Sequence, residues 1–125
     1  MGLREEAERI IAEEDKAFAE MTAAGFVEVE EKIPDVLEAW CTGMRVESVP
    51  LFTLADERFE DAGGGYNRGR IWTVTITFTV DGLDFKGVLV KKDSDLENME
   101  VTMTGYGNAL IHSIHDIAKA LRPRA

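Results

Sequence analysis

The stretch of sequence that decides the fold is WTVTITFTVDGLDFKGVLV, residues 72–90. Up to residue 80, hydrophobic residues alternate with threonines, which is the period of a half-buried β-strand. Asp81-Gly82 then predicts a two-residue type I′ turn, because both residue types tolerate a positive φ. Counting outward from the turn places four pairs on one face of a hairpin. These pairs are Val80 with Leu83, Phe78 with Phe85, Ile76 with Gly87, and Val74 with Leu89.

Further strands are expected on both sides of this hairpin. Residues 99–103 alternate after a turn at 93–95 and predict another antiparallel strand. Residues 45–54 predict a strand whose Pro50 lies at a sheet edge or a bulge, because proline has no N–H to donate. The glycine run at 63–65 predicts a loop. The strands then form a meander.

Helical periodicity brackets the strands. Hydrophobic residues of 3–24 recur with the period of an α-helix, and Gly25 is placed to end that helix in a left-handed conformation. A short second helix is expected behind Pro34, ending near Gly43. The hydrophobic residues of 110–121 predict a C-terminal helix.

We therefore expect one α+β domain over residues 1–125. Its architecture is an antiparallel β-meander of about four strands, with the long N-terminal helix, the short second helix and the C-terminal helix packed on one face. A chain of 125 residues, 45% hydrophobic, is long enough to bury one core. The single cysteine, Cys41, excludes an internal disulfide and a thiolate zinc site.

The sequence also bears on location. No hydrophobic run approaches the ~20 residues of a membrane helix. The first residues lack the basic region followed by an apolar stretch that a secretory signal has. We expect a cytoplasmic protein without a membrane association.

Charge is the most distinctive property of the chain. The formal net charge is -10, and residues 1–60 hold 16 acids against 6 bases, whereas residues 61–125 hold 8 of each. Such a field repels nucleic acid and attracts basic surfaces. We expect a basic protein partner, a nucleic-acid-binding one among the candidates, and no direct contact with nucleic acid. The acidic residues expected to bind it are Glu5, Glu6, Glu13, Asp15, Glu20, Glu28, Glu30, Glu31, Asp35 and Glu38.

The charge density of the first helix is too low for that helix alone to imitate a nucleic acid. That helix spans roughly 30 Å at ~1.5 Å per residue and carries seven acids against three bases. Duplex DNA carries one charge per ~1.7 Å. A mimic would need a second acidic row from residues 26–60, and an ordinary solvated acidic face is the alternative.

A second hypothesis is a small-molecule binder or enzyme with a cavity between the first helix and the sheet. Glu14 lies in the middle of the apolar stripe, where a desolvated carboxylate is a candidate general base or an interface residue. A glycine opposite Ile76 leaves space for a ligand. The candidate pocket residues are Glu14, Trp72, Gly87, His112 and His115.

Other motifs support no catalytic residue, metal or cofactor. His112, His115 and Asp116 share one side of the last helix, but a solvated polar face explains them better than a metal site. Asn108 is expected to cap that helix, whose free amides offer an anion site as the alternative. A third hypothesis is a structural or assembly subunit, a homodimer included, that pairs through the threonine face or an edge strand.

Overall fold

The computed structural model describes residues 2–61, 69–92, 95–105 and 109–122. A long helix α1 (Leu3–Gly43) is followed by strands β1 (Phe52–Asp61), β2 (Arg70–Val80), β3 (Leu83–Lys92), β4 (Asp95–Gly105) and β5 (Ala109–Leu110), and by helix α2 (Ile114–Leu121). The strands form an antiparallel sheet in the order β1-β2-β3-β4-β5. The α+β meander expected from the sequence is confirmed, with a two-residue fifth strand added.

The central hairpin has the expected register. Phe78 pairs with Phe85 and Val80 with Leu83, as do the other two predicted pairs. Asp81 and Gly82 have φ values of 51° and 79°, as a type I′ turn requires. The turn at 93–95 and the glycine run at 63–65 fall wholly or partly outside the described residues.

The first correction concerns the helices: α1 is continuous, and the expected stop at Gly25 and restart at Pro34 are both wrong. Gly25 is buried in the middle of the helix, where a Cβ would overlap the indole ring of Trp72. Glycine is needed there for close packing between helix and sheet. The continuous burial of Val29, Ile33 and Leu37 offsets the hydrogen bond that Pro34 removes.

The last residue of α1 is Gly43, but the left-handed residue that ends the helix is not a glycine. Arg45 takes a left-handed φ of 60°. Its N–H donates to the Thr42 carbonyl, and the N–H of Val46 donates to the Cys41 carbonyl at 2.8 Å. This is the pattern of a Schellman motif. Residues 45–51 are therefore a connection, and the strand expected at 45–54 begins only at Phe52.

The second correction concerns the C-terminal helix, which begins at Ile114 and not at residue 110. Leu110 pairs with Thr104 in β5, and the carbonyl of the buried Ile111 accepts a hydrogen bond from Trp40 Nε1 at 3.1 Å. The next element after β4 is therefore the short strand β5, and not the helix that Asn108 was expected to cap. Asn108 itself lies outside the described residues.

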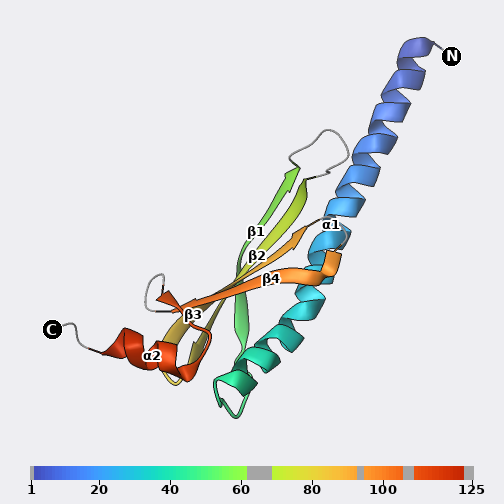
Figure 1. Ribbon diagram of the computed structural model, residues 1–125. Coiled ribbons are helices and arrows are strands. Elements are labelled where there is room, and N and C mark those ends of the chain that lie inside the picture. Colours follow the sequence, from blue (N-terminus) through green and yellow to red (C-terminus); the bar gives the residue numbers. More distant parts are fainter. Residues whose placement is uncertain (1, 62–68, 93–94, 106–108, 123–125) are drawn as a thin grey trace.

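The core lies between α1 and one face of the sheet. Its centre is formed by α1 residues spaced four apart and by the inward residues of β2 and β3. Both helices lie against this face, and Figure 1 shows the N-terminal part of α1 extending past the strands. The opposite face carries the threonine rows. The largest fully buried side chains of the described residues are Ile33, Leu37, Ile76, Leu89, Ile111, Val29, Val74 and Cys41.

Candidate interaction surface

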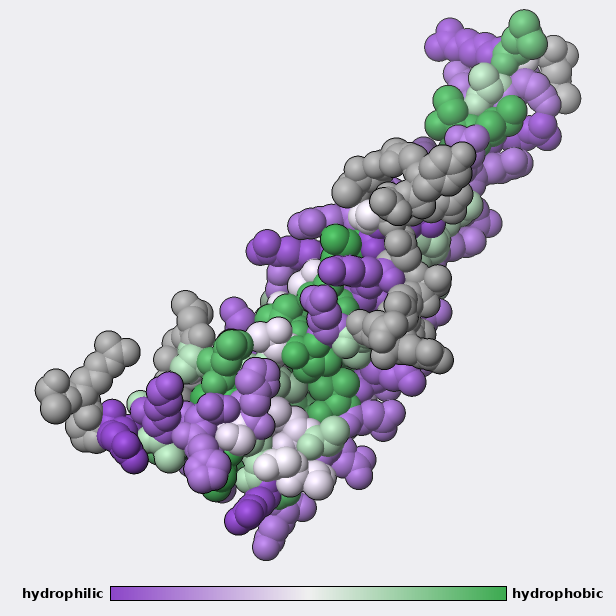
Figure 2. All heavy atoms as spheres, viewed as in Figure 1, coloured by the Kyte–Doolittle hydropathy of each residue, from purple (hydrophilic) through white to green (hydrophobic). Residues whose placement is uncertain are grey.

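The sheet covers only the second half of α1. Burial begins at Gly25, after the half-buried Met21 and Thr22, and continues to the end of the helix. Every described residue from Gly2 to Glu20 is exposed except Glu6, which is half-buried. We call residues 3–20 the free end of α1. At the upper right of Figure 2, hydrophobic and hydrophilic atoms are intermixed on this free end.

The free end carries the continuation of the core-facing stripe. Leu3 is 90% exposed, Ile11 56% and Phe18 46%, and Ile10 is similarly exposed. Phe18 makes an edge contact with Phe59 of β1, with ring centroids 5.6 Å apart, where the sheet ends. Most of the stability of helices in proteins comes from packing of their apolar face. Apart from the contact of Phe18, the free end is therefore an amphipathic helix whose apolar side has no partner in the described part of the chain.

Acidic side chains surround this stripe. The free end holds seven acids against three bases. Arg4 Nε lies 3.1 Å from Glu8 Oε1, and Arg9 pairs with Glu6 one turn away. Such exposed pairs within a helix contribute only a few tenths of a kcal/mol. Glu13, Glu14, Asp15 and Glu20 have no ion pair to a described residue, so their charge is available to a basic partner.

The predicted acidic surface divides into two groups. Five of its residues lie on the free end and five on the covered half of α1. The free-end group is Glu5, Glu6, Glu13, Asp15 and Glu20, and the covered group is Glu28, Glu30, Glu31, Asp35 and Glu38.

Within the covered group, Glu28 forms an ion pair with a buried lysine. Lys91 of β3 is only 3% exposed, and its Nζ lies 3.3 Å from Glu28 Oε2. The same Nζ lies 4.0 Å from the centroid of the Trp72 ring, which adds a cation–π attraction. The sequence does not reveal this arrangement, because it depends on how α1 lies against the ends of β2 and β3.

Glu30 faces Glu57 of β1. Their hydrogen bond raises the pKa of Glu57, and desolvation and repulsion between the two carboxyl groups act in the same direction. Two carboxyl groups that share one proton disfavour the state in which both are charged. Glu28 and Glu30 thus both lie at the contact between α1 and the sheet.

The structure does not bring the five candidate pocket residues together. Glu14 is exposed on the free end, whereas Trp72 is 3% exposed and donates from Nε1 to the Thr22 carbonyl at 3.0 Å. At Gly87, a Cβ would lie 2.9 Å from Met103 Sδ, so Met103 fills the space expected for a ligand. His112 and His115 are exposed near α2, at the other end of the molecule (Figure 1).

The carboxylate beside these histidines caps α2. Asp116 Oδ2 accepts hydrogen bonds from the N–H groups of His112 at 2.8 Å and Ser113 at 3.0 Å. The bond from His112 is the main cause that lowers the pKa of Asp116, and the bond from Ser113 adds to it. His112 precedes the helix and therefore does not share a helical face with His115. Among the described residues, no group of three His, Cys, Asp or Glu side chains is placed to hold a metal ion.

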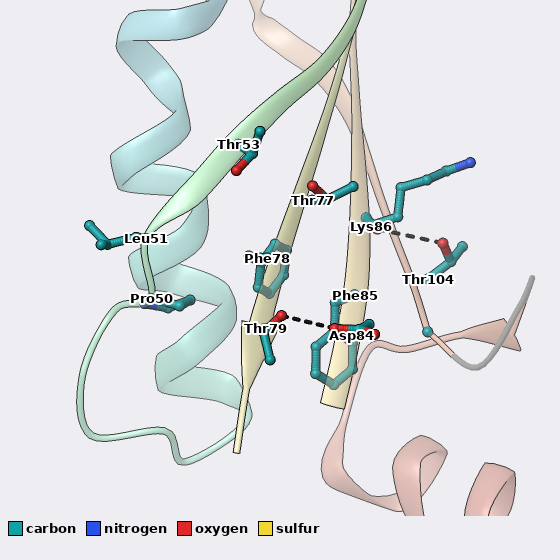
Figure 3. A pocket seen from close by; sticks show the side chains of 11 residues that line it. Pro50, Leu51, Thr53, Thr77, Phe78, Thr79, Asp84, Phe85, Lys86 and Thr104 are labelled. Atoms are coloured by element: carbon teal, nitrogen blue, oxygen red, sulfur yellow. Dashed lines mark hydrogen bonds between the residues drawn. The ribbon is translucent and has the colours of Figure 1, made fainter. Parts of the chain in front are cut away.

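Two open hollows lie on the described part of the chain away from the free end of α1. One, of about 760 Å³, lies on the threonine face between the 50–53 segment and β2 to β4 (Figure 3). Two of its polar side chains bond to each other, since Thr79 Oγ1 donates to Asp84 at 2.9 Å. The other, of about 530 Å³, lies between Trp40, the central turn and α2. Cys41 is buried on the sheet-facing side of α1, and burial raises the pKa of its thiol, which disfavours the reactive thiolate.

Comparison with known proteins supplies no family. No protein-family model, curated protein or solved structure matches this chain. Within the described residues, no helix is long and apolar enough to span a membrane. The function of the chain must therefore be inferred from the site itself.

Proposed function

We propose that this protein is a non-catalytic, acidic interaction protein that binds a basic protein through the free end of α1. The observation that carries the proposal is an exposed apolar stripe, including Leu3, Ile10 and Ile11, set among acids most of which have no ion pair to a described residue. Apolar area supplies affinity and the surrounding charge supplies the rate and choice of partner. By binding, the protein blocks or escorts a basic, nucleic-acid-handling partner in the cytoplasm.

The proposed class includes inhibitors, nucleic-acid mimics, immunity proteins and chaperones. The continuous helix spans roughly 60 Å at ~1.5 Å per residue and carries twelve acids against four bases. That density is still well below the one charge per ~1.7 Å of duplex DNA. Recognition of a basic protein segment fits this charge density better than imitation of a whole duplex.

The first test is capture from a lysate of the source organism with tagged protein at low salt, followed by elution at high salt. The captured basic protein is then purified, and its affinity is measured for wild type and for the double variant Glu13→Lys/Glu20→Lys. We expect the variant to lose at least tenfold in affinity at low salt, because attraction becomes repulsion.

The matched control is Glu31→Lys/Glu38→Lys, which changes the same charge on the covered half of the same helix. These two side chains are exposed and away from the sheet. The proposal is overturned if no basic protein is retained, or if both double variants bind it equally well or equally poorly.

A further inference from the structure

The apolar stripe of α1 changes its spacing where the sheet ends. The sheet-covered half buries Gly25, Val29, Ile33, Leu37 and Cys41, which recur every four residues. On the free end the stripe follows alternating steps of four and three. Its six positions, the last of them one residue beyond the free end, are Leu3, Ala7, Ile10, Glu14, Ala17 and Met21.

Alternating steps of four and three are the a and d positions of a heptad repeat. With Leu3 at d, Ile11 and Phe18 fall at e, beside the seam, and Glu6, Glu13 and Glu20 all fall at g. The uncovered half of α1 therefore has the pattern for pairing with a helix, whereas the covered half packs on a sheet.

Glu14 occupies an a position in the centre of this seam. It is exposed in the described chain, and it would be desolvated once a second helix covered the stripe. A carboxylate buried in an interface requires a cationic or hydrogen-bonding group opposite it. One polar residue at an a position is also a known means of selecting a partner and its register.

The charges disfavour a second copy of this chain as the occupant. In a parallel pair, Glu14 would face Glu14 of the other copy. In an antiparallel pair, the g positions face one another, which would bring Glu13 against Glu13 and Glu6 against Glu20. Like charges held at such positions are destabilising.

We propose that the free end of α1 forms a two-stranded coiled coil with a basic amphipathic helix of the partner, and that Glu14 selects a partner helix with a Lys or Arg facing it. This inference rests on the proposed function and deepens it, because it names the shape and the charge pattern of the segment that is bound. The g-row glutamates then face basic residues on the flanks of the partner helix.

The probes are two synthetic helices about three heptads long, with Leu in the core positions and Lys in the flanking positions. They differ at one central core position, which is Lys in the first peptide and Glu in the second. A parallel and an antiparallel peptide place different core positions opposite Glu14. The two peptides are therefore made in two versions, one for each orientation. We expect wild type to bind the Lys peptide at least tenfold more tightly than the Glu peptide, measured by calorimetry or fluorescence anisotropy. Glu14→Lys should reverse this preference.

The matched control is Glu5→Lys, which makes the same charge change at the outer f position. It should weaken binding of both peptides slightly and keep the preference for Lys. Circular dichroism checks that each variant folds, which is expected because both side chains are exposed.

Equal affinity of wild type for both peptides, or no reversal in Glu14→Lys, overturns the inference. The proposed function survives that result if the captured basic protein still discriminates between the two double variants. Sedimentation of the chain alone is a second check. A dimer that Ile10→Asp disperses would show that a second copy occupies the seam, and would also overturn the inference.

Discussion

Gly25 of α1 lies directly against the indole ring of Trp72 of β2, and the Trp72 Nε1 donates to the Thr22 carbonyl at 3.0 Å. The absence of a side chain at Gly25 lets the helix approach the sheet closely enough for this bond. The contact marks the place where the covered half of α1 begins. Residues 3–20, which are N-terminal to this contact, form the free end.

Gly25→Ala tests this close approach. We expect a loss of about 1–3 kcal/mol in the free energy of unfolding, because the new methyl group overlaps buried ring atoms that cannot move without repacking. Gly43→Ala is the control, since a Cβ there meets nothing within 4 Å. Urea unfolding measures both. Equal stability of the two variants would show that α1 does not depend on this contact.

Glu28→Gln tests the carboxylate beside the buried Lys91. We expect a loss of about 1 kcal/mol, because a charge-assisted bond to a desolvated ammonium becomes a neutral one. Glu31→Gln makes the same charge change on an exposed side chain of the same helix and should change stability by less than about 0.5 kcal/mol. If the two variants unfold at the same denaturant concentration, the pair contributes nothing to the α1–sheet contact.

Glu57→Gln tests the shared proton of Glu30 and Glu57. The raised pKa means that the folded protein binds more protons than the unfolded chain, so this pair loses stability as pH rises from about 4.5 through the raised value. We expect Glu57→Gln to increase the melting temperature at about pH 7 and to have little effect near pH 4.

The control for that experiment is Glu60→Gln, which lies on the same strand but on the opposite face of the sheet. Its effect on the melting temperature should not show the same dependence on pH. If Glu57→Gln raises the melting temperature equally at both pH values, Glu30 and Glu57 do not share a proton.

Local physics explains which predictions were confirmed. The central hairpin was predictable to the residue, because alternation and a two-residue turn determine both face and register between neighbours in sequence. The long N-terminal helix and the strand at 99–103 were predictable for the same reason. The acidic character of the first half follows from composition alone.

Gly25 and Pro34 show why the helix boundaries were not predictable. Each residue disfavours an isolated helix by about 1–3 kcal/mol, so helix propensity alone predicts a helix boundary at each of them. The burial of Val29, Ile33 and Leu37 against the sheet outweighs that cost, and this packing exists only in the folded chain. In the same way, Gly87 was expected to leave a cavity, but Met103 from the neighbouring strand fills it.

By itself the sequence determined the α+β class, the hairpin register and the excess of acid near the N-terminus, because these depend on neighbours along the chain. Only the tertiary structure decided that α1 is one helix, that Glu28 and Glu30 belong to its contact with the sheet, and that Glu14 lies on an uncovered end. Those outcomes depend on where the sheet stops. The length of an amphipathic stripe does not reveal how much of it the rest of the molecule will cover.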